Sequence, residues 1–231
     1  GAFMAKKRDA VVLAKSLVKV ANGAGLKTSA LITDMDEPLA SAAGNAVEIK
    51  NAVDYLTGAH RDARLHEVTL ALGAELLVLA RLATAKAAIA QLEKALGSGE
   101  AAERFQKMVS ALGGPHDFVG SCERHLPQAP IIRAVHGAKS GKIEAIDTRA
   151  LGLAVIELGG GRRVATDTID HAVGLTSLAG KAHSIDRNQP LAIVHARTED
   201  SFERAQKIIR AAYRIGKPKR ATPCVIERIG K

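Results

Sequence analysis

Apolar residues recur with helical spacing through the first half of the chain. The spacing predicts helices over 9–24 and 42–56, separated by a short apolar run at 29–32 that has the length of a buried strand. The expected inward face of the first helix is Ala10, Leu13, Ala14, Leu17, Val20 and Ala21. Three more helices are predicted at 65–83, 84–96 and 105–112, the second capped by Thr84 and the third ended by Gly113-Gly114-Pro115.

The hydrophobic period changes after a proline-bearing loop at 115–130. Short apolar runs between glycines and polar turns predict strands at 131–135, 142–146, 169–173 and 191–195, before a helix at 202–215 and a strand at 224–229. The fold class is therefore α/β. Residues 1–126 are expected to form a partial mixed sheet flanked by helices, and residues 127–231 a small β-rich domain.

The amino-acid composition limits the classes of function and partner that the chain can have. The chain has 231 residues, 47% of them apolar, which is enough for a core, but only 3% are aromatic, so stacking platforms for single-stranded nucleic acid are scarce. The net charge of +9 is scattered along the chain, which favours anionic metabolites over nucleic acid as partners. No apolar run has the length of a membrane span, and the first residues lack the hydrophobic core expected of a signal peptide. Two distant cysteines predict neither a disulfide framework nor zinc, and we expect a cytoplasmic setting.

Two patterns suggest chemistry without specifying it. The segment Gly159-Gly160-Gly161-Arg162-Arg163 could bind an anion through backbone N–H groups and guanidinium groups. It follows the helical run 150–158, however, so we favour a helix stop with solvated arginines. The eight histidines lack the spacing of a metal site, and no catalytic residue can be assigned from the pattern.

Several longer motifs match one family. They are G-A-F-M at 1–4, T-D-M-D-x-P-L at 33–39, G-N-A-x-E at 44–48, G-x-I-x-x-I-D at 141–147, D-T-R-A-L-G-L-A at 147–154, G-G-G-R-R at 159–163 and N-Q-P-L-A-x-V-H-A at 188–196. Through these motifs the chain resembles the pyrimidine nucleoside phosphorylases over nearly every segment. The resemblance implies that the β-rich domain at 127–231 is barrel-sandwich-like. It also implies pyrimidine salvage: inorganic phosphate attacks C1′ of thymidine and releases thymine and 2-deoxyribose 1-phosphate.

The resemblance also implies that the chain is the C-terminal part of a longer enzyme. The family's phosphate loop and base-holding lysine would precede Gly1, so we expect no catalytic residue here, no activity of the chain alone, and a monomer or weak associate where the full-length enzyme is a homodimer. Other interpretations remain open. Gly1-Ala2-Phe3 could be a cloning scar, and the chain could be a non-catalytic binding or regulatory module or a phosphoribosyltransferase-like relative.

Few of the family's site residues have a matching position in this chain. Leu17 matches an apolar wall of the pyrimidine pocket, and is otherwise a core-facing leucine. A potassium ion is implied at the backbone carbonyls of Leu39 and Ala42 with a side chain of the next helix. Relatives place Glu where this chain has Asn51, whose amide oxygen is still a hard donor, and Glu48 lies on the same face. The alternative is a helix start whose carbonyls bind water. No other cofactor is expected.

Overall fold

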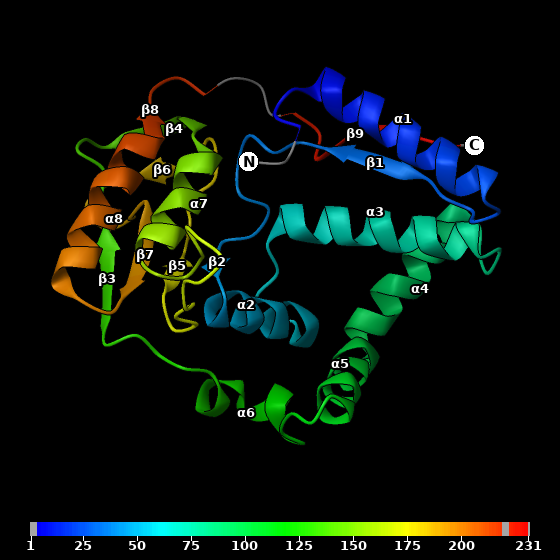
Figure 1. The fold of residues 1–231 in the computed structure, drawn as a ribbon, viewed down its shortest axis with the longest axis horizontal. Coiled ribbons are helices and arrows are strands. Elements are labelled where there is room, and N and C mark those ends of the chain that lie inside the picture. The colour runs from blue at the N-terminus through cyan, green and yellow to red at the C-terminus, as the bar shows by residue number, and fades with distance from the viewer. Residues whose placement is uncertain (1–3, 219–221, 231) are drawn as a thin grey trace.

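The computed structural model describes residues 4–218 and 222–230 and confirms the α/β class (Figure 1). Its helices are α1 (Lys7–Gly23), α2 (Ala46–Thr57), α3 (Ala63–Leu79), α4 (Ala85–Gly97), α5 (Glu100–Ala111), α6 (Phe118–His125), α7 (Thr148–Glu157) and α8 (Glu199–Ala212). Its strands are β1 (Ala30–Thr33), β2 (Ala43–Gly44), β3 (Ile131–Val135), β4 (Gly141–Ile146), β5 (Gly174–Thr176), β6 (Ser184–Ile185), β7 (Ala192–Ala196), β8 (Tyr213–Ile215) and β9 (Val225–Ile229). In this described part, no helix is long and apolar enough to cross a membrane.

The first part of the chain is mainly helical. Helix α1 packs on the two-stranded sheet β1–β9, where Ala14 and Val18 contact Ile229. Helices α3 and α4 pack side by side, and a second small core joins α2 and α6 through Val53, Phe118 and Cys122. Thr84 caps α4 as predicted, because its hydroxyl accepts a hydrogen bond from the backbone N–H of Ala87.

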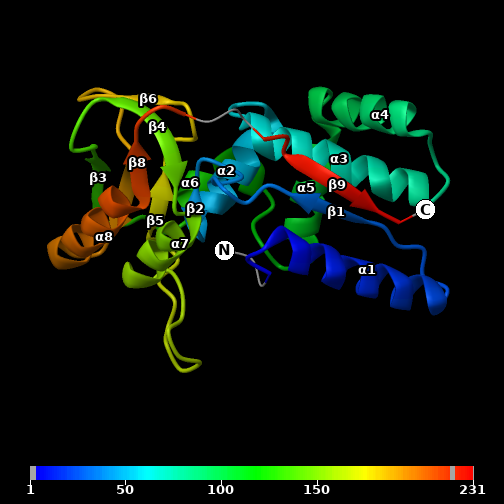
Figure 2. The same ribbon diagram turned by 90° about the horizontal axis from the view of Figure 1, so that it is seen from above.

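The second part is built on two antiparallel sheets, ordered β2-β5-β7-β3 and β6-β4-β8. Helices α7 and α8 pack against each other and against these sheets (Figure 2). The largest core of the protein lies between these layers, and its most buried side chains include Val135, Ile143, Leu175, Leu191 and Ile209. This core accounts for the apolar runs that predicted the strands.

Two strands link the two parts of the chain. Strand β2, which leads into α2, pairs with β5 of the second part, and the last strand β9 returns to pair with β1. Every strand pair among the described residues is antiparallel. The boundary between residues 126 and 127 stays a prediction.

Three expected boundaries were wrong for identifiable reasons. The predicted loop at 115–130 contains α6, because Phe118 and Cys122 lie one turn apart and bury together. The strand expected at 169–173 begins only at Gly174, since the Asp170 carboxylate accepts a hydrogen bond from Ala172 N and makes a turn. The last helix ends at Ala212 instead of Ile215, and Tyr213 begins β8, with its hydroxyl donating to Ala179 O.

The inward face of α1 is also different from the predicted one. Ala14, Val18 and the partly buried Val11 face the sheet. Leu13, Leu17 and Val20 are 39%, 60% and 68% exposed, so the interpretation of Leu17 as a core-facing leucine is wrong. The helix carries apolar residues on two sides, and spacing alone does not tell which side meets the sheet.

Candidate functional site

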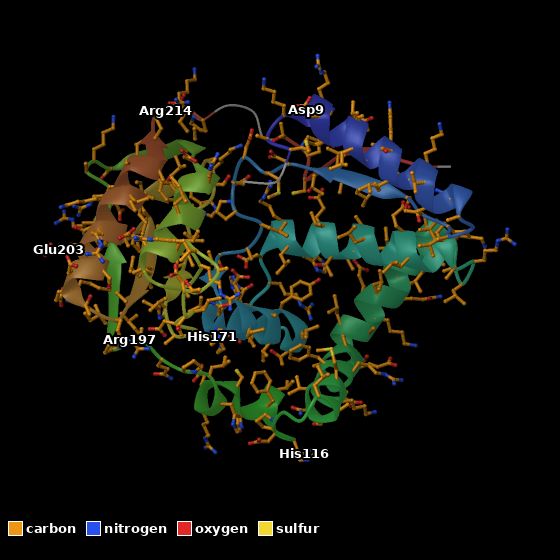
Figure 3. The ribbon with its side chains drawn as sticks, viewed as in Figure 1. Asp9, His116, His171, Arg197, Glu203 and Arg214 are labelled. Atoms are coloured by element: carbon orange, nitrogen blue, oxygen red, sulfur yellow. The ribbon has the colours of Figure 1, made fainter. Side chains whose placement is uncertain are left out.

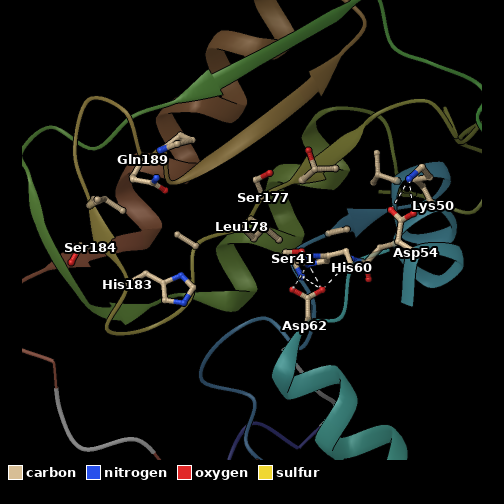
Figure 4. A pocket seen from close by; sticks show the side chains of 17 residues that line it. Ser41, Lys50, Asp54, His60, Asp62, Ser177, Leu178, His183, Ser184 and Gln189 are labelled. Carbon is tan, nitrogen blue, oxygen red and sulfur yellow. Dashed lines mark hydrogen bonds and ion pairs between the residues drawn. The ribbon is translucent and has the colours of Figure 1, made fainter. Parts of the chain in front are cut away.

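A polar cavity of about 470 Å³ lies where the start of α2 meets the loops between β5 and β7. Lys50, Asn51 and Asp54 line it from α2, and the loops before α2 and α3 supply Ser41, His60 and Asp62. His183 and Gln189 face it from the second part of the chain, across the cavity from Lys50 and Asp54 (Figure 4). Residues from both parts of the molecule therefore line this cavity.

The Asp62 carboxylate is the centre of the hydrogen bonds on one side of this cavity. Its Oδ2 accepts from Ser41 N at 3.1 Å, Ser41 Oγ at 3.1 Å and Asn51 Nδ2 at 3.0 Å, and its Oδ1 lies 3.1 Å from His60 Nε2 (Figure 4). Burial alone would raise the pKa of Asp62, but the hydrogen bonds from Asn51, Ser41 and His60 outweigh it and hold the pKa below its usual range. Asp62 is thus an ionised acceptor at neutral pH.

The predicted cation residues line the same cavity as this carboxylate or its neighbour. Ala42 and Asn51 line the cavity, and Leu39 lines a neighbouring cavity of about 140 Å³ together with Asp62. The Glu48 carboxylate is engaged in another contact. It accepts a hydrogen bond from Gly44 N at 2.7 Å at the start of α2. The structure therefore brings Leu39, Ala42 and Asn51 into one region, while potassium itself stays a prediction.

Leu17 lies away from that region. It is on α1, which packs against β1 and β9, whereas the cation residues lie at the start of α2 (Figure 1). The segment 1–3 of the G-A-F-M motif lies outside the described residues. The role of Leu17 in a pyrimidine pocket stays a prediction, and its exposed side chain is accessible to a ligand or to another segment.

The T-D-M-D-x-P-L motif forms a polar junction. The buried Asp34 accepts from Thr222 Oγ1 at 2.7 Å, and its backbone oxygen accepts from Arg64 Nη2 at 2.9 Å. Glu37 accepts from Lys181 N at 2.8 Å and lies 3.0 Å from Arg64 Nη1. These contacts connect the loop after β1 with α3 and with the loop between β5 and β6, so the motif fixes the position of the loop that holds Leu39 and Ala42.

The glycine-arginine segment at 159–163 ends α7, as predicted. Gly159 adopts a φ of +95° and donates to Ile156 O, which is a left-handed helix stop. The backbone N–H groups of Arg163 and Val164 both donate to the Asp167 carboxylate. The anion-binding positions of this loop are therefore filled by a side chain of the same chain, which argues against a phosphate cradle.

Apart from His60 and His183, which line the same cavity, the histidines lie in separate places. His116 lies near α6 and His171 near the start of α2 (Figure 3), where His171 O accepts from Ala46 N. His195 is mostly buried, which lowers its pKa, and its Nε2 lies 2.9 Å from Thr176 Oγ1. Across residues 4–218 and 222–230, no group of three histidine, cysteine or acidic side chains is placed to hold a metal ion.

Asp62, Ser41 and His60 were not identified from the sequence. Asp62 occupies the residue before α3, where an aspartate is ordinarily explained as a helix cap, but its side chain makes no cap hydrogen bond. His60 is two positions from Asp62, but the partners Asn51 and Ser41 are 11 and 21 positions away in the chain. No periodic signal connects residues at such separations.

Comparison with known families agrees with this architecture. Residues 1–102 match the profile of the glycosyl transferase family, a/b domain, and residues 142–216 match the pyrimidine nucleoside phosphorylase C-terminal domain. By the fold and the order of these two matches, the chain is similar to the pyrimidine nucleoside phosphorylases.

One curated relative narrows the resemblance. The chain is 49% identical over all 231 residues to the thymidine phosphorylase of Burkholderia lata. The match covers 100% of this chain and 53% of the relative, so the chain spans about half the length of that protein. This coverage agrees with the expectation that the chain corresponds to one part of such an enzyme.

Proposed function

We propose that the chain contributes to a thymidine phosphorylase, a pentosyltransferase of pyrimidine salvage. The observation that carries this proposal is the 49% identity to the Burkholderia lata enzyme, sustained over the whole chain. In the proposed reaction a phosphate oxygen forms a bond to C1′ of thymidine. The bond from C1′ to N1 breaks, its electron pair leaves with the base, and thymine takes up a proton.

The described residues support a scaffolding and pocket-forming contribution. Catalysis of this kind needs donors that stabilise the charge developing on phosphate and base. The one glycine-arginine loop that resembled a phosphate site is occupied by Asp167. We therefore propose that the 231-residue chain alone does not turn over thymidine, and that Leu17 contributes an apolar wall to the pyrimidine pocket of the assembled enzyme.

We also propose potassium as the structural ion of this part. Backbone carbonyls of Leu39 and Ala42 and the amide oxygen of Asn51 are hard oxygen donors, the type that alkali and alkaline-earth cations prefer. The hydrogen bonds of Asp62 hold Ser41 and Asn51 in one cluster, which fits a small cation in this region. The ion would supply charge that stabilises the loop before α2. We further propose a cytoplasmic location, a homodimeric full-length enzyme, and a monomeric state for this chain.

Complementation tests the proposed activity. The chain would be mixed with a separately produced piece of the Burkholderia lata thymidine phosphorylase that supplies the remainder of that protein. We expect thymine release, followed by ultraviolet absorbance, to need both pieces, thymidine and phosphate. Omission of phosphate and replacement of the second piece by an unrelated protein are the controls.

The outcomes separate the alternatives. Turnover that occurs only when both pieces are present supports the phosphorylase proposal. Turnover by the 231-residue chain without the second piece, in a sample verified by mass spectrometry, would contradict the proposed dependence. Folded, co-migrating pieces that release no thymine would favour a non-catalytic binding module.

A further inference from the structure

The proposed potassium site has an unusual charge balance. The side chain that the resemblance places in the site is neutral in this protein, because Asn51 stands where a glutamate is expected. Glu48, on the same helix, is held by Gly44 N. A site with only neutral donors binds cations weakly, since affinity depends on the number of charged ligands.

Of the two carboxylates that line the cavity, one is already neutralised. Lys50 Nζ lies 2.7 Å and 2.6 Å from the two oxygens of Asp54. Asp62 has no lysine or arginine partner among the described ion pairs, and its contact there is the imidazole of His60, whose side chain is 55% exposed. Asp62 is therefore the available negative charge beside Asn51, Ser41 and Ala42.

The hydrogen bonds of Asp62 also fix the orientation of the Asn51 amide. An ionised carboxylate only accepts, so the end of the amide that faces it must be the NH₂ group. The 3.0 Å contact from Nδ2 to Asp62 Oδ2 agrees with this requirement. The oxygen Oδ1 is left on the other end of the amide, where no described hydrogen bond engages it.

The same carboxylate holds the loop that carries the carbonyl donors. Ser41 stands between Leu39 and Ala42 in the chain, and both its backbone N–H and its hydroxyl donate to Asp62 Oδ2. Asp62 is only 16% exposed, so solvent competes little with these bonds. One side chain thereby restrains all three predicted ligand positions.

We propose that Asp62 is the positioning residue of the cation site: it orients the Asn51 amide, restrains the 39–42 loop and supplies the negative charge that Asn51 lacks. This inference rests on the proposed binding of potassium. It does not require that the chain act on thymidine. Substitution of a residue that orients metal ligands in this way typically costs about 10–100-fold in metal affinity.

Thermal unfolding of the 231-residue chain in potassium chloride and in choline chloride at equal ionic strength tests the proposal. A bound ion stabilises the folded state by mass action, and we expect Tm to be about 2–4 °C higher in potassium chloride. Asp62→Asn should abolish this difference, whatever its effect on Tm itself. Glu48→Gln is the matched control, because it removes a carboxylate of the same region and should keep the difference.

A charge exchange provides the positive test. The double variant Asn51→Glu/Asp62→Asn returns the carboxylate to α2 and should restore the potassium difference, and Asn51→Glu alone should increase it. The exchange also keeps the proposal testable if Asp62→Asn does not fold, because one carboxylate remains in the cluster. Thallium-205 NMR of the same variants measures ion binding directly.

Three results would overturn the proposal. The wild-type chain could show equal Tm in both salts and no thallium signal, which removes the ion but leaves the phosphorylase proposal intact. Asp62→Asn could retain the full potassium difference, which removes Asp62 from the site. A folded exchange variant could lack the difference, which shows that the position of the charge has no bearing on binding.

Discussion

Arg64 Nη1 lies 3.0 Å from Glu37 Oε1 in a contact where both side chains are largely buried, at 18% and 14% exposure. Glu37 uses its other oxygen to accept from Lys181 N. One carboxylate therefore ties the start of α3 to a loop of the second part of the chain. The junction lies next to the loop of Leu39 and Ala42, so its integrity bears on the candidate site.

Glu37→Gln should destabilise the protein. Glutamine has one acceptor oxygen and cannot serve both partners, and the Arg64 guanidinium is left with less compensation for its burial. We expect the free energy of unfolding in urea to fall by about 2–3 kcal/mol. Glu199→Gln is the control, since Glu199 pairs with Arg133 on the surface, at 60% and 52% exposure, and its loss should have a much smaller effect. Equal losses in both variants would show that the junction is no stronger than a surface pair.

Thr222→Val should lower the stability of the protein at neutral pH and make that stability depend less on acid. Burial would raise the pKa of Asp34, but hydrogen bonds from Thr222 and Asp36 N and the charges of Lys181 and Arg64 together lower it. Because the folded-state pKa is lowered, the stabilisation is present above the usual range of aspartate, near pH 4, and is lost as pH falls through the folded value.

The measurement for this variant is the free energy of unfolding at pH 7 and at pH 3. We expect Thr222→Val to be less stable than wild type at pH 7, with the difference shrinking towards pH 3 as Asp34 becomes protonated. A difference that is independent of pH would mean that Thr222 acts through packing and has no influence on the charge of Asp34.

The glycines of the G-N-A-x-E motif and of β5 should resist substitution. Strands β2 and β5 approach so closely that a Cβ on Gly174 would lie 2.7 Å from Ala43 O, and one on Gly44 would lie 2.9 Å from Val173 O. Gly174→Ala should cost more than about 2 kcal/mol of stability. Gly152→Ala is the control, because the space around this position in α7 is open and alanine should stabilise the helix by about 1 kcal/mol. Similar responses of the two variants would contradict the close approach.

The sequence predicted most elements and little of the site. Helix α4, its Thr84 cap and strand β3 follow directly from spacing and cap chemistry, because these signals are local. Helix α6 was missed because the prolines and glycines around it predict a loop, and only burial of Phe118 against α2 makes it a helix. Its stability comes from contacts distant in the chain, which periodicity does not record.

The site shows the same limit more strongly. Family motifs located Leu39, Ala42 and Asn51, but the carboxylate that joins them comes from Asp62, in a segment with no motif of its own. The motif residues Asp34 and Glu37 form a buried polar junction that the motif itself does not predict. Tertiary contacts assign these roles, so spacing along one chain could not.

Leu17 and Val18 are neighbours on α1 with opposite expected behaviour. Val18 is 8% exposed and contacts the β1–β9 sheet, so Val18→Ala should lower the free energy of unfolding by about 2 kcal/mol. Leu17 is 60% exposed, so Leu17→Ala should change the stability of this chain by less than about 0.5 kcal/mol. In the complementation assay Leu17→Ala should have the larger effect of the two substitutions, because Leu17 is proposed to line the pyrimidine pocket. Leu17→Ala should raise the KM for thymidine. Val18→Ala, measured at a temperature where it is folded, should leave this KM unchanged. Urea unfolding and initial rates of thymine release measure the two effects. An unchanged KM for Leu17→Ala would remove this residue from the pocket, and a large loss of stability would show that it is packed against the protein after all.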